Sequence, residues 1–273
     1  MYFGIPMLIA QISDLHLVPA GALAYATVDT GALLQEALAA VLRLEPLPDC
    51  VLLTGDLVEA GDAPAYARLR ALLEVLPMPC YLLPGNHDDR GALCAEFHGD
   101  HWRHVATMPA GFVQYSVEDF AVRLIVLDTS VPGAGHGELC PQRLAWLAAA
   151  LDAPPARPTV IAMHHPPFAT GLAEMDRLAL RAGGAALETL LWAHPEVERV
   201  VCGHVHRPIM RRFGGTLVCT SPATAHQVAF DLRPEAPAAL VMEPPGLLLH
   251  LWCDGALVTH QVVARAAGPA RPF

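Results

Sequence analysis

Short apolar runs along the chain alternate with segments whose apolar residues recur every three or four positions. Runs of this length, bounded by turn residues, predict buried strands, which we expect at residues 8–12, 51–53, 81–83, 124–127, 160–163 and 200–202. The segments between them predict amphipathic helices. Because strands and helices alternate, the chain is expected to adopt a layered α/β fold.

Three helices are predicted from their apolar stripes. The first begins near Asp29 or Thr30, and the third begins at Pro141, a residue that suits the first turn of a helix. Spacings of three and four residues place one face of each helix against the core. These faces carry Leu33, Leu34, Ala37, Leu38, Val41 and Leu42 in the first helix, Tyr66, Leu69, Leu72, Leu73 and Leu76 in the second, and Leu144, Leu147 and Leu151 in the third.

Three further segments, 112–127, 216–232 and 247–263, predict β-hairpins, with turns at Glu118-Asp119 in the first and Asp254-Gly255 in the last. They predict a second, partly antiparallel sheet. We expect a single domain over 1–273, in which 207–273 completes the second sheet and adds a C-terminal hairpin. That hairpin lacks clean alternation of apolar and polar residues, which predicts that another subunit covers one of its faces. A homo-oligomer is therefore expected.

Composition and charge indicate which binding partners and which cellular location to expect. No apolar run approaches the roughly 18 residues that span a bilayer, and the N-terminus lacks the pattern of a secretory signal. We therefore expect no membrane association and a cytoplasmic location. The formal net charge of −10 argues against a stable nucleic acid partner, because such binding needs clustered Lys and Arg. The 7 cysteines, without a C-x-x-C pair, are expected to be reduced, buried thiols.

Polar residues gather where five of the predicted strands end. The five clusters are Ser13-Asp14-Leu15-His16, Gly55-Asp56, Gly85-Asn86-His87-Asp88, His164-His165 and Gly203-His204-Val205-His206. Because α/β sheets bind ligands beyond the carboxyl ends of their strands, we expect these clusters to meet at one site. Taken singly, the patterns at Asp14 and Asp56 are typical of helix caps or turns. His204 and His206 are more specific, since side chains two apart on extended backbone point the same way and can serve neighbouring metals.

In this order the clusters resemble the motifs of the calcineurin-like metallophosphoesterases, D-x-H, G-D, G-N-H-[DE], H and G-H-x-H, over about residues 14–206. The resemblance implies a four-layer α/β/β/α sandwich with two mixed β-sheets flanked by helices. It also implies two metal ions, bridged by Asp56. One is held by Asp14, His16, Asp56 and His206, and the other by Asp56, Asn86, His164 and His204. Oxygen and imidazole ligands suit Mn, Fe, Co or Zn as divalent or trivalent ions. No role is assigned to His165.

The implied chemistry is hydrolysis of a phosphoester by a hydroxide that bridges the metals. Two divalent ions outweigh the charges of Asp14 and Asp56 by two units, which a hydroxide and one monoanionic diester would neutralise. His87 is expected to contact the substrate, where it would stabilise charge or protonate the leaving oxygen.

Three segments indicate which branch of this family the chain resembles. GNHDD at 85–89, HHPPFATGLAEMD at 164–176 and SPATAHQV at 221–228 resemble the class III cyclic nucleotide phosphodiesterases and their glycerophosphodiesterase relatives. The resemblance implies that His226 lines the substrate pocket, whereas the residues alone fit a histidine at a hairpin edge equally well. The arginine of the phosphatase motif G-D-x-x-D-R-G is missing after Asp56.

We therefore expect a metal-dependent phosphodiesterase that acts on small phosphodiesters, either 3′,5′-cyclic nucleotides or glycerophosphodiesters. A phosphomonoesterase or a nuclease of the same superfamily is the alternative. A non-catalytic binding module would be expected to have lost metal ligands, and none of the seven is lost. A purely structural metal site would usually be closed by four ligands, commonly cysteines, which this set does not use.

Overall fold

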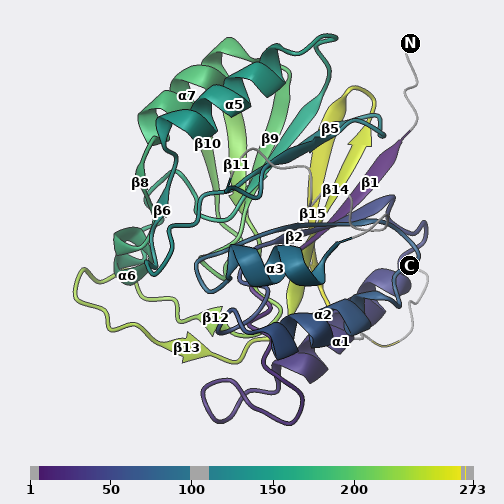
Figure 1. Ribbon diagram of the computed structural model, residues 1–273, viewed down its shortest axis with the longest axis vertical. Helices are drawn as coiled ribbons and strands as arrows, with labels where there is room; N and C mark the ends of the chain where they lie inside the picture. The colour runs from purple at the N-terminus through teal and green to yellow at the C-terminus, as the bar shows by residue number, and fades with distance from the viewer. Residues whose placement is uncertain (1–5, 99–110, 266–267, 269–273) are drawn as a thin grey trace.

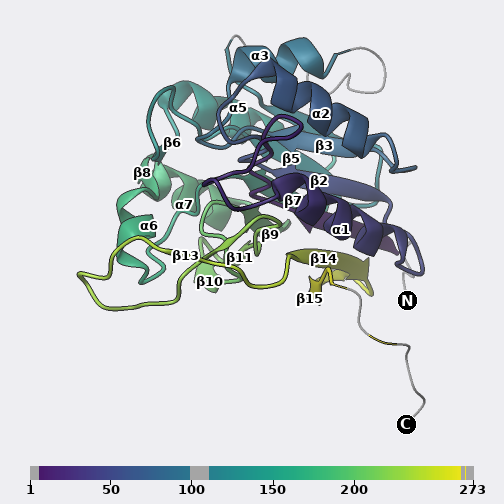
Figure 2. The same ribbon diagram turned by 90° about the horizontal axis from the view of Figure 1, so that it is seen from below.

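The computed structural model describes residues 6–98, 111–265 and 268, and two β-sheets lie face to face at its centre (Figures 1 and 2). The first sheet has five strands in the order β15-β14-β1-β2-β3. Parallel strands β1, β2 and β3 are joined at one edge by an antiparallel hairpin, β14 and β15. Their bounds are Met7–Ile12 for β1, Cys50–Thr54 for β2, Cys80–Leu83 for β3, Gly246–Cys253 for β14 and Ala256–Val263 for β15.

The second sheet has six strands in the order β10-β11-β9-β7-β5-β4. Its four central strands are parallel, and the two edge strands run antiparallel to their neighbours. The bounds are Tyr115–Val117 for β4, Arg123–Leu127 for β5, Thr159–Met163 for β7, Val197–Cys202 for β9, Met210–Phe213 for β10 and Thr216–Thr220 for β11. Both sheets are therefore mixed.

Helices cover the outer side of each sheet (Figure 2). The first sheet is covered by α1 (Thr30–Leu42), α2 (Ala63–Leu73) and α3 (Arg90–Glu96), and the second by α5 (Pro141–Asp152) and α7 (Gly184–Ala193). This arrangement confirms the predicted four-layer sandwich. The remaining elements are α6 (Ala173–Arg177), the pair β6 (Gly137–Glu138) and β8 (Leu180–Ala182), and the pair β12 (Gln227–Val228) and β13 (Leu240–Val241).

Strand β5 shows why the predicted strands read as continuous apolar runs. Its residues Leu124 and Val126 belong to the core between the two sheets, whereas Ile125 and Leu127 pack with the residues of α5 and α7. Successive side chains of a strand point to opposite faces, so a strand covered on both faces is apolar at every position. All six predicted strands are confirmed.

The predicted helices are also present, with two differences. Asp29 caps α1, because its side chain accepts a hydrogen bond from the backbone N–H of Ala32 at 3.0 Å. Pro141 is the first residue of α5. Leu42, predicted on the buried face of α1, is 39% exposed. Helix α2 ends at Leu73, before the last residue of its predicted stripe, because Pro77 disfavours helical backbone in the residue that precedes it.

Two of the three predicted hairpins are confirmed, and the one at 216–232 is wrong. Strands β4 and β5 pair as expected, and β14 and β15 meet through the Asp254-Gly255 turn. Strand β11 pairs instead with the preceding β10. The turn between them is Gly214-Gly215, where φ is +58° and +85°, and two-residue hairpin turns favour such left-handed backbone.

Two predictions drawn from composition can be compared with the structure. All seven cysteines are unpaired, but only four are buried, while Cys94, Cys140 and Cys253 are partly exposed. Within residues 6–98 and 111–265, no helix has the length and apolar character required to cross a membrane.

Candidate metal centre

The five polar clusters lie on the loops that follow β1, β2, β3, β7 and β9, and they meet between the two sheets. Asp14, His16, Asp56, His204 and His206 all have left-handed backbone, with φ between +43° and +73°. Such backbone is uncommon outside glycine and is maintained only when surrounding contacts impose it. These contacts turn the chain sharply after β1, β2 and β9 and direct the side chains towards a common point.

Four side chains form the first cluster, and all four are buried. The Nε2 atoms of His16 and His206 are 3.1 Å apart. Asp14 Oδ1 lies 3.4 Å from His206 Nε2, and Asp56 Oδ2 lies 3.6 Å from His16 Nε2. Two imidazole nitrogens and two carboxylates therefore face the same small volume, as predicted for the first metal.

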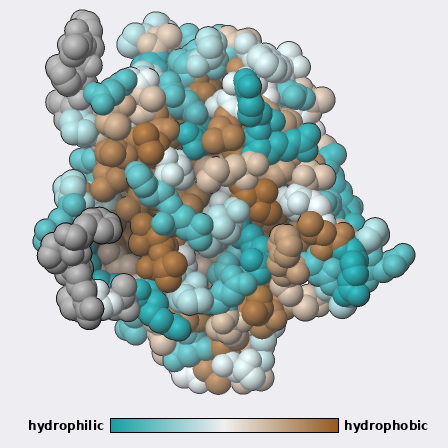
Figure 3. Space-filling view, turned by 180° about the vertical axis from the view of Figure 1, so that it is seen from behind, coloured by the Kyte–Doolittle hydropathy of each residue, from teal (hydrophilic) through white to brown (hydrophobic). Residues whose placement is uncertain are grey.

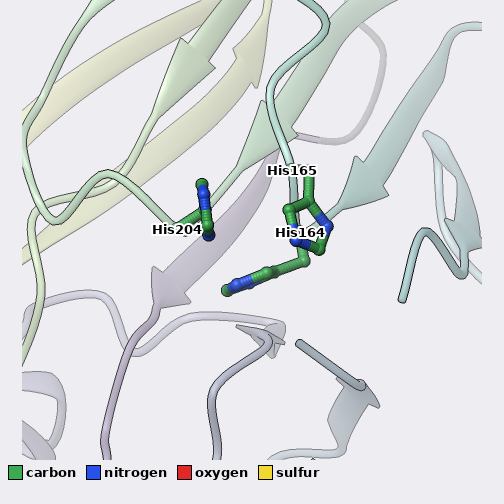
Figure 4. A group of neighbouring side chains, drawn as sticks. All are labelled: His164, His165 and His204. Carbon is green, nitrogen blue, oxygen red and sulfur yellow. The ribbon is translucent and has the colours of Figure 1, made fainter. Parts of the chain in front are cut away.

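The second cluster shares Asp56 with the first. His164 Nε2 lies 3.4 Å from Asp56 Oδ2 and 3.2 Å from Asn86 Oδ1, and His204 Nδ1 lies 3.0 Å from the same Asn86 oxygen. Figure 4 shows His164 reaching into the site from the loop after β7, and His204 from the loop after β9. All seven predicted ligands are thus brought together in two adjoining clusters.

His165 packs beside the second cluster (Figure 4). Its ring lies 4.5 Å from that of His204 and 4.8 Å from that of His164, measured between ring centres. Both ring nitrogens have protein partners: Nδ1 contacts the Thr129 hydroxyl at 2.8 Å, and Nε2 contacts the Gly135 carbonyl at 3.3 Å. His165 therefore supports the neighbouring imidazoles.

Hydrogen bonds at Nδ1 orient three of the imidazoles. The Nδ1 atoms of His164 and His206 each lie 2.8 Å from a backbone carbonyl, of Thr54 and His226 respectively. A carbonyl can only accept, so Nδ1 carries a hydrogen and Nε2 is the nitrogen turned towards the site, where a metal ion would take the place of a proton. His16 Nδ1 is 2.7 Å from the Glu59 carboxylate, an arrangement that has the same effect.

Glu59 is a site residue that the sequence reasoning missed, and Asp88 is one that it included in a cluster without a role. Besides contacting His16, Glu59 accepts from His87 Nδ1 through its carbonyl at 2.8 Å. Asp88 accepts from the backbone N–H groups of Gly85 at 2.8 Å and Leu57 at 3.0 Å, which ties the loop after β3 to the loop after β2. The fourth position of the GNHD motif was the only available sign of Asp88, and Glu59 had none beyond its place three residues after Asp56.

The site leaves no space for a side chain at Gly85, directly before Asn86. A Cβ atom at this position would lie 2.2 Å from Asp56 Oδ1 and 2.4 Å from the Asp56 backbone nitrogen. Neither contact is possible, so any side chain here would displace the carboxylate that both clusters share.

Electrostatics keep both aspartates ionised. Burial alone would raise the pKa of Asp14, but the charge and hydrogen bond of His206 outweigh it and bring the pKa to about 2. For Asp56, the effect of burial is likewise outweighed, mainly by His164, and the pKa is well below its usual value. Burial and the charge of His164 lower the pKa of His204 to about 3, so this imidazole is neutral.

This donor set fits the implied metals. Ionised carboxylates, an amide oxygen and imidazole nitrogens that release a proton when a metal binds are ligands of first-row transition ions. His204 presents Nδ1 to the second cluster, 3.0 Å from the Asn86 oxygen, and its buried Nε2 atom has no hydrogen-bond partner among the described residues.

His87 and His226 lie at the edge of the first cluster. The backbone N–H of His87 donates to Asp56 Oδ1 at 2.9 Å, and its side chain remains 33% exposed. The His226 ring lies 4.6 Å from the His206 ring and 5.2 Å from the His16 ring, measured between centres. Both histidines are therefore close enough to contact a molecule held at the clusters.

Stacked mixed sheets with aspartate, asparagine and histidine ligands at the strand ends define a metallophosphoesterase. The chain matches the family Calcineurin-like phosphoesterase over residues 7–208, and it belongs to that family. The sequence resemblance is confirmed, and with it the expectation of an enzyme that hydrolyses phosphoric esters.

Similar proteins identify the branch of the family. The chain is 35% identical to a probable glycerophosphodiester phosphodiesterase GpdQ of Arcobacter nitrofigilis, with 96% of each chain covered. It is 37% identical to a probable cyclic nucleotide phosphodiesterase of Rhodopseudomonas palustris, with 94% of this chain and 93% of that protein covered. Among solved structures, a dimetal phosphatase of Danio rerio has the same fold at a TM-score of 0.64 and 15% identity, covering 93% of this chain and 98% of that one.

The position of Asp56 between the clusters leads to a prediction about metal content. Asp56→Asn should lose most of both metals, from about two per chain to well under one, because it removes the charge that both ions share. Asn86→Ala removes an uncharged ligand of one cluster and should cost at most one ion. Metal analysis of the purified variants measures this, with exposed Asp152→Asn as the control. If Asp56→Asn kept both ions, the shared-ligand assignment would be wrong.

Proposed function

We propose that this protein is a binuclear phosphodiesterase that hydrolyses small phosphodiesters, either 3′,5′-cyclic nucleotides or glycerophosphodiesters. The observation that carries the proposal is the shared carboxylate: Asp56 Oδ2 lies 3.4 Å from a ligand nitrogen of one cluster and 3.6 Å from one of the other. Such a carboxylate suits two adjacent metal ions. Bound there, the ions would activate water and stabilise charge on the phosphoryl oxygens.

Seven residues are proposed as ligands, in the two sets already described. Asp14, His16, Asp56 and His206 would hold one ion, and Asp56, Asn86, His164 and His204 the other. Manganese, iron, cobalt and zinc all suit this donor set. The retained ligands disfavour a non-catalytic binding module.

His87 is proposed as the catalytic group of the protein itself. Its ring lies edge-on to that of His16 with centres 4.6 Å apart, so it borders the first metal position. Burial lowers the pKa of His87, but the charge of Asp56 and the carbonyl of Glu59 raise it above its usual value overall. The protonated ring can therefore stabilise negative charge on the phosphoryl group or give a proton to the leaving oxygen.

Charge balance favours a diester over a monoester. The Glu59 carboxylate adds one negative charge beside His16, and burial, which raises its pKa, is outweighed by His16 and His87, so it stays ionised. Protonated His87 offsets that charge. The surplus of two positive charges at the metals is then still matched by one hydroxide and one monoanionic diester, whereas a dianionic monoester would exceed it by one negative charge.

Space beside the site suits a small substrate. A cavity of about 150 Å³ adjoins Asn86 and is lined by Arg90 and by residues 130–133. Arg90 is held there by Asp128, with Nε–Oδ2 at 2.6 Å. Such a cavity can receive one short ester arm, and the relatives named as glycerophosphodiester and cyclic nucleotide phosphodiesterases support a substrate of this size. A phosphomonoesterase or nuclease remains the alternative, which the substrate comparison below tests.

His87→Ala should retain both metals and lose turnover. Groups that stabilise or protonate in the transition state contribute roughly 10²- to 10⁴-fold, so kcat should fall within that range. Metal analysis beside kcat for a chromogenic diester measures the two effects separately. Exposed His260→Ala serves as the matched control. Loss of metal from His87→Ala would contradict its assignment as a non-ligand.

The wild-type protein should hydrolyse an aryl diester faster than the matched aryl monoester. His226→Ala should lower kcat/KM for the diester roughly ten- to hundredfold, about 1.4 to 2.7 kcal/mol, without a change in metal content. The main-chain carbonyl that orients His206 survives this substitution. Faster hydrolysis of the monoester, with His226→Ala indifferent, would refute both the preference and the role of His226.

We also propose a homo-oligomer, with β15 at the interface. This strand is an edge of the first sheet and pairs only with β14 among the described strands. It exposes Val258 and Val263, at 43% and 55%. Figure 3 views the molecule from behind, where brown hydrophobic residues are visible in several places. An exposed apolar edge strand tends to pair with another chain. The cytoplasmic location and the lack of a stable nucleic acid partner stay predictions.

Sedimentation tests the oligomer. At micromolar concentration the wild-type protein should sediment as more than one subunit, and Val258→Lys, which places a charge on the edge strand, should shift it towards the monomer. Arg265→Lys, close in sequence to β15 and without a change in charge, is the control. A wild-type monomer under these conditions would refute the proposal.

A further inference from the structure

The loop between β1 and α1 contains a turn that its sequence does not favour. Ala24 and Val28 form an isolated antiparallel bridge, and the N–H of Thr27 donates to the Ala24 carbonyl at 3.1 Å. The two residues at the tip, Tyr25 and Ala26, have φ of +48° and +59°. Turns with two left-handed residues are normally built from Asn and Gly, and a bulky aromatic residue at such a φ is strained. The sequence thus has a tyrosine at a position whose backbone conformation asparagine or glycine would adopt with less strain.

Contacts at the base of the loop hold this turn in place. Val18, Ala24 and Val28 form a small buried core of their own. From α2, Arg68 Nη1 donates to the Val18 carbonyl at 2.8 Å. Figure 2 shows the loop, in dark purple, crossing the middle of the view near the segments that follow β9 and β11. The turn is therefore anchored on both sides, and it carries its tip residue to the end of the molecule where the clusters lie.

Tyr25 reaches two residues of the site. Its ring lies edge-on to His226, with centres 5.0 Å apart and an angle of 83° between the planes. Burial, together with the charge of the nearby Glu59 carboxylate, raises the pKa of the Tyr25 phenol to about 12, so the hydroxyl stays protonated beside that carboxylate. His226 and Glu59 both contact His16. His226 and Glu59 thus lie between Tyr25 and the first cluster.

The tyrosine is not needed to fill the core of its loop. It is 47% exposed, and the buried residues of the loop core do not include it. A half-exposed aromatic ring with strained backbone, packed edge-on against His226, is accessible to a molecule that enters from solution. Strain of this kind is maintained at binding sites, where a fixed side chain is useful.

We propose that Tyr25 is a specificity-determining residue that contacts one ester arm of the substrate, next to His226, and favours arms that are planar. The inference rests on the proposed function for the position of the phosphoryl group at the metals. The His226 ring forms the second side of this wall, at 83° to the Tyr25 ring. Two rings at nearly right angles offer face and edge contacts to a base or an aryl group, and they offer little to a flexible polyol.

Kinetics with two kinds of diester test the proposal in the metal-loaded protein. In Tyr25→Asn, which suits the left-handed turn, kcat/KM for 3′,5′-cyclic AMP and for bis(p-nitrophenyl) phosphate should fall roughly five- to tenfold, mainly through KM. The value for glycerophosphoethanolamine should change less than about threefold, and metal content should be unchanged. Tyr25→Phe keeps the ring and should retain most of the preference. Ala26→Gly, which relaxes the same turn, is the control and should behave as wild type.

A binding measurement separates this proposal from the proposed function. Adenosine 5′-monophosphate and glycerol 3-phosphate carry the same phosphate and differ in the arm, so calorimetry of each with the metal-loaded protein gives a ratio of Kd values. Tyr25→Asn should weaken the first about five- to tenfold and leave the second nearly unchanged. If the wild-type protein hydrolysed no diester, the proposed function would fail and this ratio would still decide the role of Tyr25. Equal effects on both ligands, or no effect, would refute the proposal.

Discussion

The buried carboxylate of Asp56 is the point on which the rest of the site depends. One of its oxygens lies within 3.6 Å of both His16 and His164, and the other accepts the N–H of His87 at 2.9 Å. A buried charge is tolerated only where partners compensate for the lost water. The loops after β1, β3 and β7 supply those partners, so the charge requirement of a single side chain draws three strand ends together and links the two sheets.

Further hydrogen bonds connect the proposed metal ligands to the interior of the two sheets. Thr54, whose carbonyl orients His164, is held through its hydroxyl by Gln11 of β1 at 2.9 Å. The same Gln11 amide donates to the Cys202 carbonyl at 2.9 Å, and its oxygen lies 3.0 Å from His250 Nε2 in β14. A chain of hydrogen bonds therefore runs through the interface between the sheets and reaches the C-terminal hairpin. Because each member of this chain of hydrogen bonds is buried, replacing any one of them by an apolar residue would leave a buried polar group without a partner.

The strained loop backbone is understandable in the same way. Left-handed φ at the proposed metal ligands destabilises each loop on its own. The polar contacts that form when the loops meet offset this free-energy cost of backbone strain. Tyr25 and His226, the residues proposed to contact the substrate, belong to a loop after β1 and a segment after β11 that approach the first cluster from outside it. If both proposals hold, metal binding directly after the strands is separate from substrate recognition on longer loops, as in many α/β folds.

The sequence by itself determined the α/β layering, the six buried strands and the seven side chains that gather at their ends. Strand 124–127 illustrates why: both of its faces are covered, so its apolar run is uninterrupted and local in sequence. The hairpin at 216–232 was mispredicted because β-pairing depends on which strand is nearest in space, and Gly214-Gly215 directed β11 back onto β10. Only the tertiary structure revealed Glu59 and Tyr25 as neighbours of the site and showed which contacts Asp88 makes there. Their roles arise from contacts with residues distant in the chain, and no spacing or periodicity of their own encodes those contacts.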